Sequence, residues 1–334
     1  MVGAGAVGGY LAARLISSNQ AEVAIIERGP HLSAIRNDGL RLITPEEELR
    51  VRPVAVVESA SELPAQDIVF VALKTTAYAG LARNLVGLLA RDGYAMFINN
   101  GIPWWWNSGL SRRERPLALL DPGEELWRVL TPERVLGCVI YSMNEVIAPG
   151  VIQHNGNNRW IVGEPNDTMS ERMTRTAHLL KQAGLNAECS LDLRRNVWAK
   201  LLRNAPLNSI CALTRLSIAG LAGEPGILKL VNAVIDEIVA VASAHGSDIS
   251  EYVSAARAAP TLGGAVAGQK VGEVKPSMLQ DALAGRAMEV EAILGQPESF
   301  AREAGIPTPA IDVILPLLRA LNHGLQTAPR DAQK

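Results

Sequence analysis

Three glycines near the start of the chain constrain its fold more strongly than any other feature. Gly3, Gly5 and Gly8 have the spacing G-x-G-x-x-G within the segment VGAGAVGG. In this motif the first glycine permits a tight turn, the second lets a pyrophosphate approach the backbone, and the third lets a helix pack closely on a strand. The pyrophosphate then lies at the positive end of the helix that follows. The spacing predicts a phosphate-binding loop that includes Ala6 and Val7.

The sequence that follows this loop alternates between strands and helices. Short apolar runs predict buried strands at residues 22–27, 67–73 and 94–99, and helical patterns between them predict helices at 10–17 and 79–89. This alternation indicates a parallel sheet with helices on both faces. Only Met1 and Val2 precede the first glycine, whereas a strand needs about five residues. We therefore expect the natural start of the protein to lie upstream of Met1.

Two residues at the end of the second predicted strand bear on the choice of cofactor. Glu27 lies about 20 residues after the loop, where an acid hydrogen-bonds the ribose 2′-hydroxyl of NAD. Arg28 follows it, and an arginine at this place pairs with the 2′-phosphate of NADP. The chemistry of the two side chains alone leaves both cofactors open.

A polar segment in the middle of the chain, GEPNDTMS at residues 163–170, marks a change in composition. Before it, strands are expected at residues 134–141, 151–154 and 159–162. After it, apolar residues at helical spacing predict long helices at 227–244, 278–304 and 310–321. The chain of 334 residues exceeds the size of about 250–300 residues at which a single core stops growing. We therefore expect an α/β domain over residues 1–167 and a helical domain over residues 168–334.

Charge, hydropathy and cysteine usage narrow the classes of partner. The formal net charge is -2 and no block of like charge occurs, so a basic patch for nucleic acid or an anionic membrane is not expected. No run of about 18 apolar residues predicts a transmembrane helix. The three cysteines are far apart, and no two histidines stand at metal-ligand spacing, so neither a disulfide nor a metal site is expected. This usage favours a reducing cytoplasm.

Residues 196–214, NVWAKLLRNAPLNSICALT, place a polar stripe on an apolar helix. Lys200, Asn204 and Asn208 follow one another at intervals of four, which lines them up on one face. A solvated face is the alternative interpretation, although an exposed face more often uses Glu, Lys or Arg than the weaker helix former asparagine. Asparagine carries a donor and an acceptor that can orient a substrate. A lysine can donate a proton near neutral pH when burial lowers its pKa.

A second group of polar residues lies in the segment SMLQDALAGRAME. Ser277 follows Pro276 at an expected helix start, where a capping role is the simplest interpretation. Glu289 is expected about three turns further along the same helix. On the pattern alone, a solvated glutamate is the better interpretation of Glu289.

Together these segments resemble the ketopantoate reductases (2-dehydropantoate 2-reductases) from the first residue to near the last. The resemblance is carried by VGAGAVGG, VALKTTAY around Lys74, INNG around Asn100, RNVWAKLLRNAPLN around Lys200, and KPSMLQDALAGRAME ending at Glu289. Their order and separations are far more specific than a glycine loop alone. The resemblance implies a Rossmann-type N-terminal domain and an all-α C-terminal domain like that of 6-phosphogluconate dehydrogenase, with the site in the cleft between them.

The resemblance also implies an activity: the NADPH-dependent reduction of ketopantoate to pantoate, a step towards pantothenate and coenzyme A. Lys200 matches the general acid of the family. Asn204 and Asn208 match residues that hold the substrate in the family. Ser277 matches the residue that contacts the substrate carboxylate, and Glu289 matches the residue that binds the substrate hydroxyl.

The cofactor and the assembly are expected from the same resemblance. Lys74 and Asn100 match residues beside the cofactor and the substrate. Arg28 matches the arginine that reads the 2′-phosphate, which favours NADP while NAD stays open because of Glu27. The expected partners are a small 2-oxo acid and a second copy of the chain in a homodimer.

Three departures from the family pattern keep other functions open. Ser209 follows Asn208 where the family usually has proline, Glu27 precedes Arg28, and three tryptophans occupy residues 104–106. The tryptophans indicate either loop packing or a larger, more apolar pocket near the nicotinamide. The alternatives are a reductase of another 2-oxo acid, ketone or imine, and a dinucleotide-binding sensor without catalysis. Retention of the polar residues named above disfavours the sensor.

Overall fold

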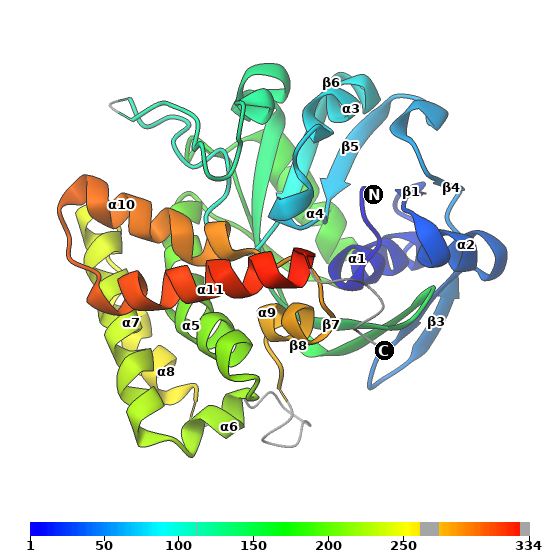
Figure 1. Cartoon of the computed structure of the whole chain (residues 1–334). Helices are drawn as coiled ribbons and strands as arrows, with labels where there is room; N and C mark the ends of the chain where they lie inside the picture. Colours follow the sequence, from blue (N-terminus) through cyan, green and yellow to red (C-terminus); the bar gives the residue numbers. More distant parts are fainter. Residues whose placement is uncertain (112, 261–273, 328–334) are drawn as a thin grey trace. The chain divides into compact units, whose positions relative to one another are not determined.

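The computed structural model describes residues 1–111, 113–260 and 274–327, and in it the chain folds as two units. The first unit contains Met1–Asn99 and Trp104–Leu193. The second contains Asn100–Pro103 and Arg194–Lys334. In Figure 1 the first unit is coloured from blue to green, and most of the second from green to red.

The first unit is built on mixed β-structure. Its strands are β1 (Ala24–Ile26), β2 (Leu40–Ile43), β3 (Glu48–Val51), β4 (Ala55–Val57), β5 (Gln66–Val71), β6 (Leu89–Ile98), β7 (Val135–Ala148), β8 (Val151–Gly163) and β9 (Asn186–Cys189). Its helices are α1 (Ala6–Ser17), α2 (Gly29–Asp38), α3 (Leu81–Leu88) and α4 (Glu171–Gln182). The strand order is β3-β2-β8-β7-β6-β5, with β9 beside β8, while β1 pairs with β4.

The direction of the strands departs in part from the expected parallel sheet. The pairs β2–β3 and β7–β8 are antiparallel, and the other strand pairs are parallel. The strands from which a parallel sheet is expected, β1, β5 and β6, pair only in parallel. In the two antiparallel pairs only a short turn joins the strands, and a short turn can connect only antiparallel neighbours. The strands expected at 151–154 and 159–162 are parts of one strand, β8.

Val2 stands in the place of a first strand. It forms parallel bridges to Val71, at the end of β5, and to Ile26, at the end of β1. Its amide donates to the carbonyl of Phe70 at 2.8 Å, and the amide of Ala72 donates to its carbonyl at 3.0 Å. Val2 thus joins the two sets of strands through its backbone and leads directly into the glycine loop.

The helix after the glycine loop is fixed by its apolar side. Tyr10 and Leu11 of α1 are 0% exposed, and α1 packs against β2, β3, β7 and β8. The ring of Tyr10 stacks on His154 of β8 with 4.4 Å between the ring centroids. Burial of this apolar side sets the direction in which the start of α1 points.

The first unit extends beyond the sequence boundary at residue 167. Helix α4 packs on β8 and β9, and β9 pairs with β8 from Arg159↔Asn186 to Val162↔Cys189. The polar segment 163–170 is therefore the turn that leads from β8 into α4. The chain passes to the second unit after Leu193. The composition marks this turn, but the long-range pairing of β9 with β8 leaves no local pattern in the sequence.

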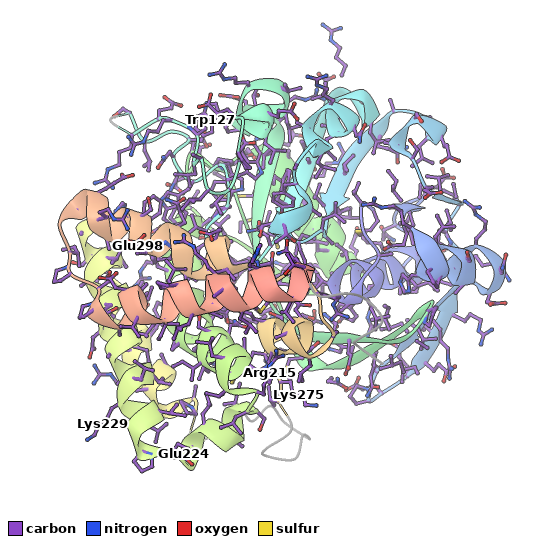
Figure 2. All side chains as sticks on the ribbon, viewed as in Figure 1. Trp127, Arg215, Glu224, Lys229, Lys275 and Glu298 are labelled. Atoms are coloured by element: carbon purple, nitrogen blue, oxygen red, sulfur yellow. The ribbon has the colours of Figure 1, made fainter. Side chains whose placement is uncertain are left out.

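Helices dominate the described part of the second unit. They are α5 (Leu193–Thr214), α6 (Ile218–Ala222), α7 (Pro225–Ala244), α8 (Val253–Ala258), α9 (Ser277–Leu283), α10 (Gln296–Ala304) and α11 (Pro309–Thr327). Helix α7 is amphipathic. Ile235 and Ile238 are 0% exposed, whereas Lys229 is exposed and points away from the helices in Figure 2. Helices α7 and α11 confirm the helices expected at 227–244 and 310–321. Among the described residues, no helix has both the length and the apolar character needed to cross a bilayer.

The long helix expected at 278–304 is wrong. Helix α9 ends at Leu283, and the chain resumes as a π-helical turn at Glu291–Gly295 that leads into α10. Gly285 has a φ of +63°, in the left-handed region that glycine adopts readily. The amide of Arg286 donates to the carbonyl of Asp281 at 2.9 Å, which closes the end of α9.

A buried ion pair ties α4 to the strands of the first unit. The side chain of Glu164 is 4% exposed and that of Arg172 is 28% exposed. Arg172 Nε and Nη2 donate to the two carboxylate oxygens at 2.7 and 2.5 Å. The same guanidinium donates to the carbonyl of Val135 at 3.2 Å, at the start of β7. One arginine thus connects α4, β7 and the end of β8.

We expect Glu164→Gln to lower the free energy of unfolding by about 2–3 kcal/mol, because it leaves the partly buried arginine charge without its partner. Urea unfolding followed by circular dichroism measures the change. Glu48→Gln is the matched control, since Glu48 pairs with Arg41 at the surface, where an ion pair contributes little. Equal losses in the two variants would show that burial of the Glu164 pair has no special weight.

Candidate active site

The glycine loop has the three-part geometry that its spacing predicts. Gly3 has a φ of +82°, and a Cβ there would lie 2.7 Å from Leu73 Cδ2. A Cβ at Gly8 would overlap the carbonyl oxygen of Gly3 and lie 2.9 Å from the Cβ of Ala72. At Gly5 no described atom lies within 4 Å of such a Cβ. The first and third glycines are therefore needed for packing, and the second leaves the backbone open to a pyrophosphate.

The start of α1 supplies the donors for that anion. The helix begins at Ala6, directly after Gly5, and Val7 lies in its first turn. The first amides of an α-helix have no acceptor within the helix, and they lie at the positive end of its dipole. The residues of the loop therefore fit a dinucleotide diphosphate.

Glu27 lies against the glycine loop. The amide of Ala4 donates to its Oε2 at 2.7 Å, and the amide of Arg28 donates to its Oε1 at 2.9 Å. Glu27 is half-buried, whereas Arg28 is exposed. The structure therefore fixes the acid close to the loop and leaves the arginine at the surface, where it can meet a bulky anion.

His31 is a residue of this region that the sequence analysis missed. Its Nε2 lies 2.8 Å from the carbonyl oxygen of Ala4, and the amide of Gly150 donates to its Nδ1 at 2.9 Å. These partners assign the hydrogen to Nε2, because Nδ1 accepts. His31 thus links the glycine loop to the turn between β7 and β8. The sequence shows only an isolated histidine, so no local signal could have found this role.

Lys74 lies at the same edge of the first unit as the glycine loop. It follows β5, whose last residue, Val71, forms a bridge to Val2. The amide of Ala72 donates to the carbonyl of Val2, so the two chain segments leave the sheet side by side. This edge, at the carboxyl ends of parallel strands, is where ligands bind in such sheets.

In the second unit, Lys200 and Asn100 are hydrogen-bonded although they lie far apart in the sequence. Lys200 Nζ donates to Asn100 Oδ1 at 2.6 Å. Lys200 is half-buried on α5, and Asn100 belongs to the short segment Asn100–Pro103 that packs with this unit. The bond holds the ammonium group at one point, which a proton donor requires.

The polar stripe of α5 is interrupted by a proline. Asn204 is half-buried and Asn208 is 3% exposed, so a solvated face does not describe the whole stripe. Pro206 lies between them and has no amide to donate to the carbonyl of Leu202. Ser209 is 0% exposed, and its hydroxyl has no hydrogen-bond partner among the described residues.

Asn208 and Ser277 are brought together at the start of α9. The Oδ1 atom of Asn208 accepts from Met278 N at 3.3 Å and from Ser277 Oγ at 3.4 Å. The amide nitrogen of an asparagine side chain can donate two hydrogen bonds. The expected N-cap role of Ser277 is wrong, because Ser277 is the first helical residue and Pro276 occupies the cap.

Glu289 is separated from Ser277 by the end of α9. It is 8% exposed and lies between Met288 and Val290, which are 1% and 2% exposed. The expectation that Glu289 continues the helix of Ser277 is wrong, because α9 ends near Gly285. The burial of Glu289 also excludes the interpretation as a solvated glutamate. It stands directly before the π-helical turn, a type of turn that is frequent at functional sites.

The tryptophan segment belongs to the interior of the first unit. Trp104, Trp105 and Trp106 are 1%, 1% and 2% exposed. Trp104 meets Phe97 edge to face, with 5.5 Å between the ring centroids. Trp105 lies against Gly137, where a Cβ would overlap its ring. Loop packing is therefore the interpretation that the structure favours.

Cys211 is a potential nucleophile on the same helix as Lys200. Cys211 lies on α5 at 0% exposure, and burial raises the pKa of its thiol to about 12. A thiol in this state is not a nucleophile at neutral pH. In the part of the chain that the structure describes, no three His, Cys, Asp or Glu side chains gather closely enough to hold a metal ion.

We expect Gly5→Ala and Gly8→Ala to separate binding from folding. A methyl group at Gly5 has space but obstructs the pyrophosphate, so NADPH affinity should fall about tenfold or more with little change in Tm. A methyl group at Gly8 would overlap the backbone of Gly3. Such overpacking lowers the free energy of unfolding by on the order of a few kcal/mol, so Tm should fall by several degrees. Fluorescence titration and thermal unfolding measure the two effects. Loss of affinity and of Tm in parallel for both variants would contradict this division.

Comparison with known proteins identifies the family of the chain. Residues 1–167 match the family Ketopantoate reductase PanE/ApbA, and residues 192–322 match its C-terminal domain family. A relative from Mesorhizobium japonicum, named 2-dehydropantoate 2-reductase, is 37% identical over 96% of each chain. The crystal structure of 2-dehydropantoate 2-reductase from Geobacter metallireducens has a TM-score of 0.80 at 26% identity and covers 96% of this chain and 98% of its own.

A third similarity concerns the fold alone. D-mandelate dehydrogenase, solved with NADH and anilino(oxo)acetate, has a TM-score of 0.81 at 20% identity, covering 98% of this chain and 100% of its own. The family matches span both units, and they include the glycine loop and the residues around Lys200. The chain therefore belongs to the ketopantoate reductase family.

Proposed function

We propose that this chain reduces 2-dehydropantoate to pantoate, with NADPH as the reductant. The observation that carries the proposal is the hydrogen bond of 2.6 Å between Lys200 Nζ and Asn100 Oδ1. It supports the role of Lys200 as the general acid, because a half-buried ammonium group is held in one position by a neutral acceptor. Family membership and the open backbone at Gly5 support the nicotinamide dinucleotide as its cofactor.

The residues of the chain would act on the keto group and on the charge that forms there. When bound, NADPH supplies the hydride that reduces the keto carbon. Negative charge then develops on the keto oxygen, and the ammonium of Lys200 stabilises that charge and transfers a proton to the oxygen. The carbonyl becomes a hydroxyl, and Lys200 regains a proton from water. Asn100 keeps Nζ at the point where the oxygen must meet it.

The remaining polar residues would orient the substrate. Asn204 and Asn208 lie on the same helix as Lys200, and the amide nitrogen of Asn208 is a donor suited to an anionic or carbonyl oxygen. Ser277 would contact the carboxylate. Glu289 would accept from the hydroxyl of the substrate, since an ionised carboxylate accepts hydrogen bonds and cannot donate them. A homodimer, which the family resemblance implies, is part of the proposal.

The choice of NADPH depends on Arg28. Its exposed position supports a contact with the 2′-phosphate, for which a guanidinium is well suited. NADH is the second candidate, and a specific observation favours it: Glu27 is fixed by two amides beside the loop, where a carboxylate binds the ribose hydroxyls of NAD.

Steady-state kinetics with ketopantoate and NADPH test the activity. We expect Lys200→Met to lower kcat about 100-fold or more, because it removes the proton donor. Arg203→Met is the matched control, since Arg203 is an exposed cation on the same helix, and its kcat should stay near that of the wild type. NADPH binding by the Lys200 variant should be unchanged. A loss of only a few-fold in kcat would reject Lys200 as the general acid.

The cofactor preference is tested with a pair of variants. Arg28→Ala should lower kcat/KM for NADPH about tenfold or more, because it removes a hydrogen bond between charged groups. The kcat/KM for NADH should stay near the wild-type value. Glu27→Gln should weaken NADH more than NADPH. It removes a charge that repels the 2′-phosphate, whereas the loss of one backbone hydrogen bond of Glu27 affects both cofactors. The ratio of kcat/KM for the two cofactors measures each effect. A wild-type preference for NADH, with no change of ratio in Arg28→Ala, would establish the second candidate instead.

A further inference from the structure

A four-residue segment belongs to the second unit although its neighbours in sequence belong to the first. Asn100–Pro103 pack with the second unit, whereas Asn99 and Trp104 pack with the first. The segment begins with the partner of Lys200. Whatever fixes these four residues within the second unit therefore also fixes the acceptor of the ammonium group.

Gly101 is pressed against the backbone of Ala292. It has a φ of +78°, and a Cβ at this position would overlap the carbonyl group of Ala292 and lie 3.0 Å from its Cβ. The next amide, of Ile102, donates to the carbonyl oxygen of Ala292 at 2.7 Å. The side chain of Ile102 is 0% exposed. Only glycine fits this place, for its conformation and for its lack of a side chain.

The carbonyl of Ala292 is available because of the irregular helix in which it lies. In an α-helix it would accept from the amide of Gln296, but in the π-helical turn Gln296 donates to Glu291 instead. The next residue, Pro297, has no amide hydrogen. A π-helical turn followed by proline thus leaves the Ala292 carbonyl for Ile102.

We propose that Gly101 and the carbonyl of Ala292 form a positioning contact that holds Asn100 against Lys200 during reduction of the keto acid. The inference rests on the proposed role of Lys200 as the general acid. Gly101 is bonded directly to Asn100, so its distance from Ala292 sets where the acceptor of the ammonium lies. Both residues would act through Asn100, as positioning residues.

Glu289 lies two residues before this turn and is hydrogen-bonded to it. The amide of Ile293, next to Ala292, donates to the carbonyl of Glu289 at 3.2 Å. One backbone contact therefore relates the proton donor, through Asn100, to the residue proposed to bind the substrate hydroxyl. The contact would therefore help to set the position of the proton donor relative to Glu289.

Gly101→Ala tests the proposal, with Gly305→Ala as the matched control. Gly305 lies in the same unit with a φ of +69°, and no described atom lies within 4 Å of a Cβ there. Both variants place alanine in a left-handed conformation, so both carry the same backbone strain. Only the alanine at 101 must move away from Ala292.

The expected result is a loss of kcat with little loss of binding. Gly101→Ala should lower kcat with ketopantoate about tenfold or more, as a displaced catalytic group does, while KM for NADPH changes less than about twofold. Gly305→Ala should keep kcat near the wild-type value. Equal kcat in the two alanine variants would overturn the proposal.

A measurement without substrate separates this inference from the proposed function. Protein labelled with ¹³C at the lysine side chains, with Lys200 assigned through Lys200→Arg, reports the titration of each ammonium group by NMR. In Gly101→Ala the titration of Lys200 should move to lower pH, since an acceptor that stabilises the charged form has been displaced. An unchanged titration would overturn the inference. Absence of turnover in the wild type would overturn only the proposed function.

Pro297→Ala keeps the test decisive if Gly101→Ala does not fold. This change adds no atom at the contact and restores an amide that competes with Ile102 for the Ala292 carbonyl. The titration of Lys200 should move in the same direction, and kcat should fall while Tm stays near the wild-type value. If Pro297→Ala leaves both kcat and the titration unchanged, the Ala292 carbonyl does not position Asn100.

Discussion

The position of the glycine loop depends on the backbone hydrogen bonds of the residues that lead into it. Val2 is held by the backbone of Phe70 and Ala72 on one side, while the amide of Gly3 donates to Ile26 on the other. Each such bond contributes only about 1 kcal/mol net, so the position of the loop also needs contacts from the helix side. These contacts are possible because Gly8 has no side chain, so that α1 can approach the loop closely. The phosphate site thus depends on small residues that permit close backbone packing.

In the second unit, the residues of the candidate site lie near interruptions of the helices. Pro206 interrupts α5 between two asparagines, the short α9 begins beside Asn208, and a π-helical turn follows Glu289. Each interruption leaves a backbone group without its usual partner in the helix. At the start of α9 the side chain of Asn208 accepts from Met278 N, and in the π-helical turn the carbonyl of Ala292 accepts from the distant Ile102 N. The polar groups proposed to meet the substrate therefore lie where regular helix geometry fails.

The sequence predicted the parts of this structure that follow from local pattern. The glycine spacing predicted both the loop and the start of α1, and the i, i+4, i+8 spacing placed Lys200 on one helix with both asparagines. Most of the failures share one physical cause, because they depend on partners far along the chain. No local pattern shows that β9 pairs with β8, that His31 bonds the loop, or that Gly101 meets Ala292. Gly285 could have signalled the end of α9, since glycine commonly terminates helices.

Several residues of the candidate site also complete the backbone, and this affects how variants should be interpreted. The carboxylate of Glu27 accepts from Ala4 N, and the side chain of Asn208 accepts from Met278 N. Removing either side chain takes away a ligand contact and a structural hydrogen bond together. Lys200 differs, because its hydrogen bond joins two side chains. Because this bond involves no backbone group, variants at Lys200 report on the proposed proton donor more directly than variants at Glu27 or Asn208.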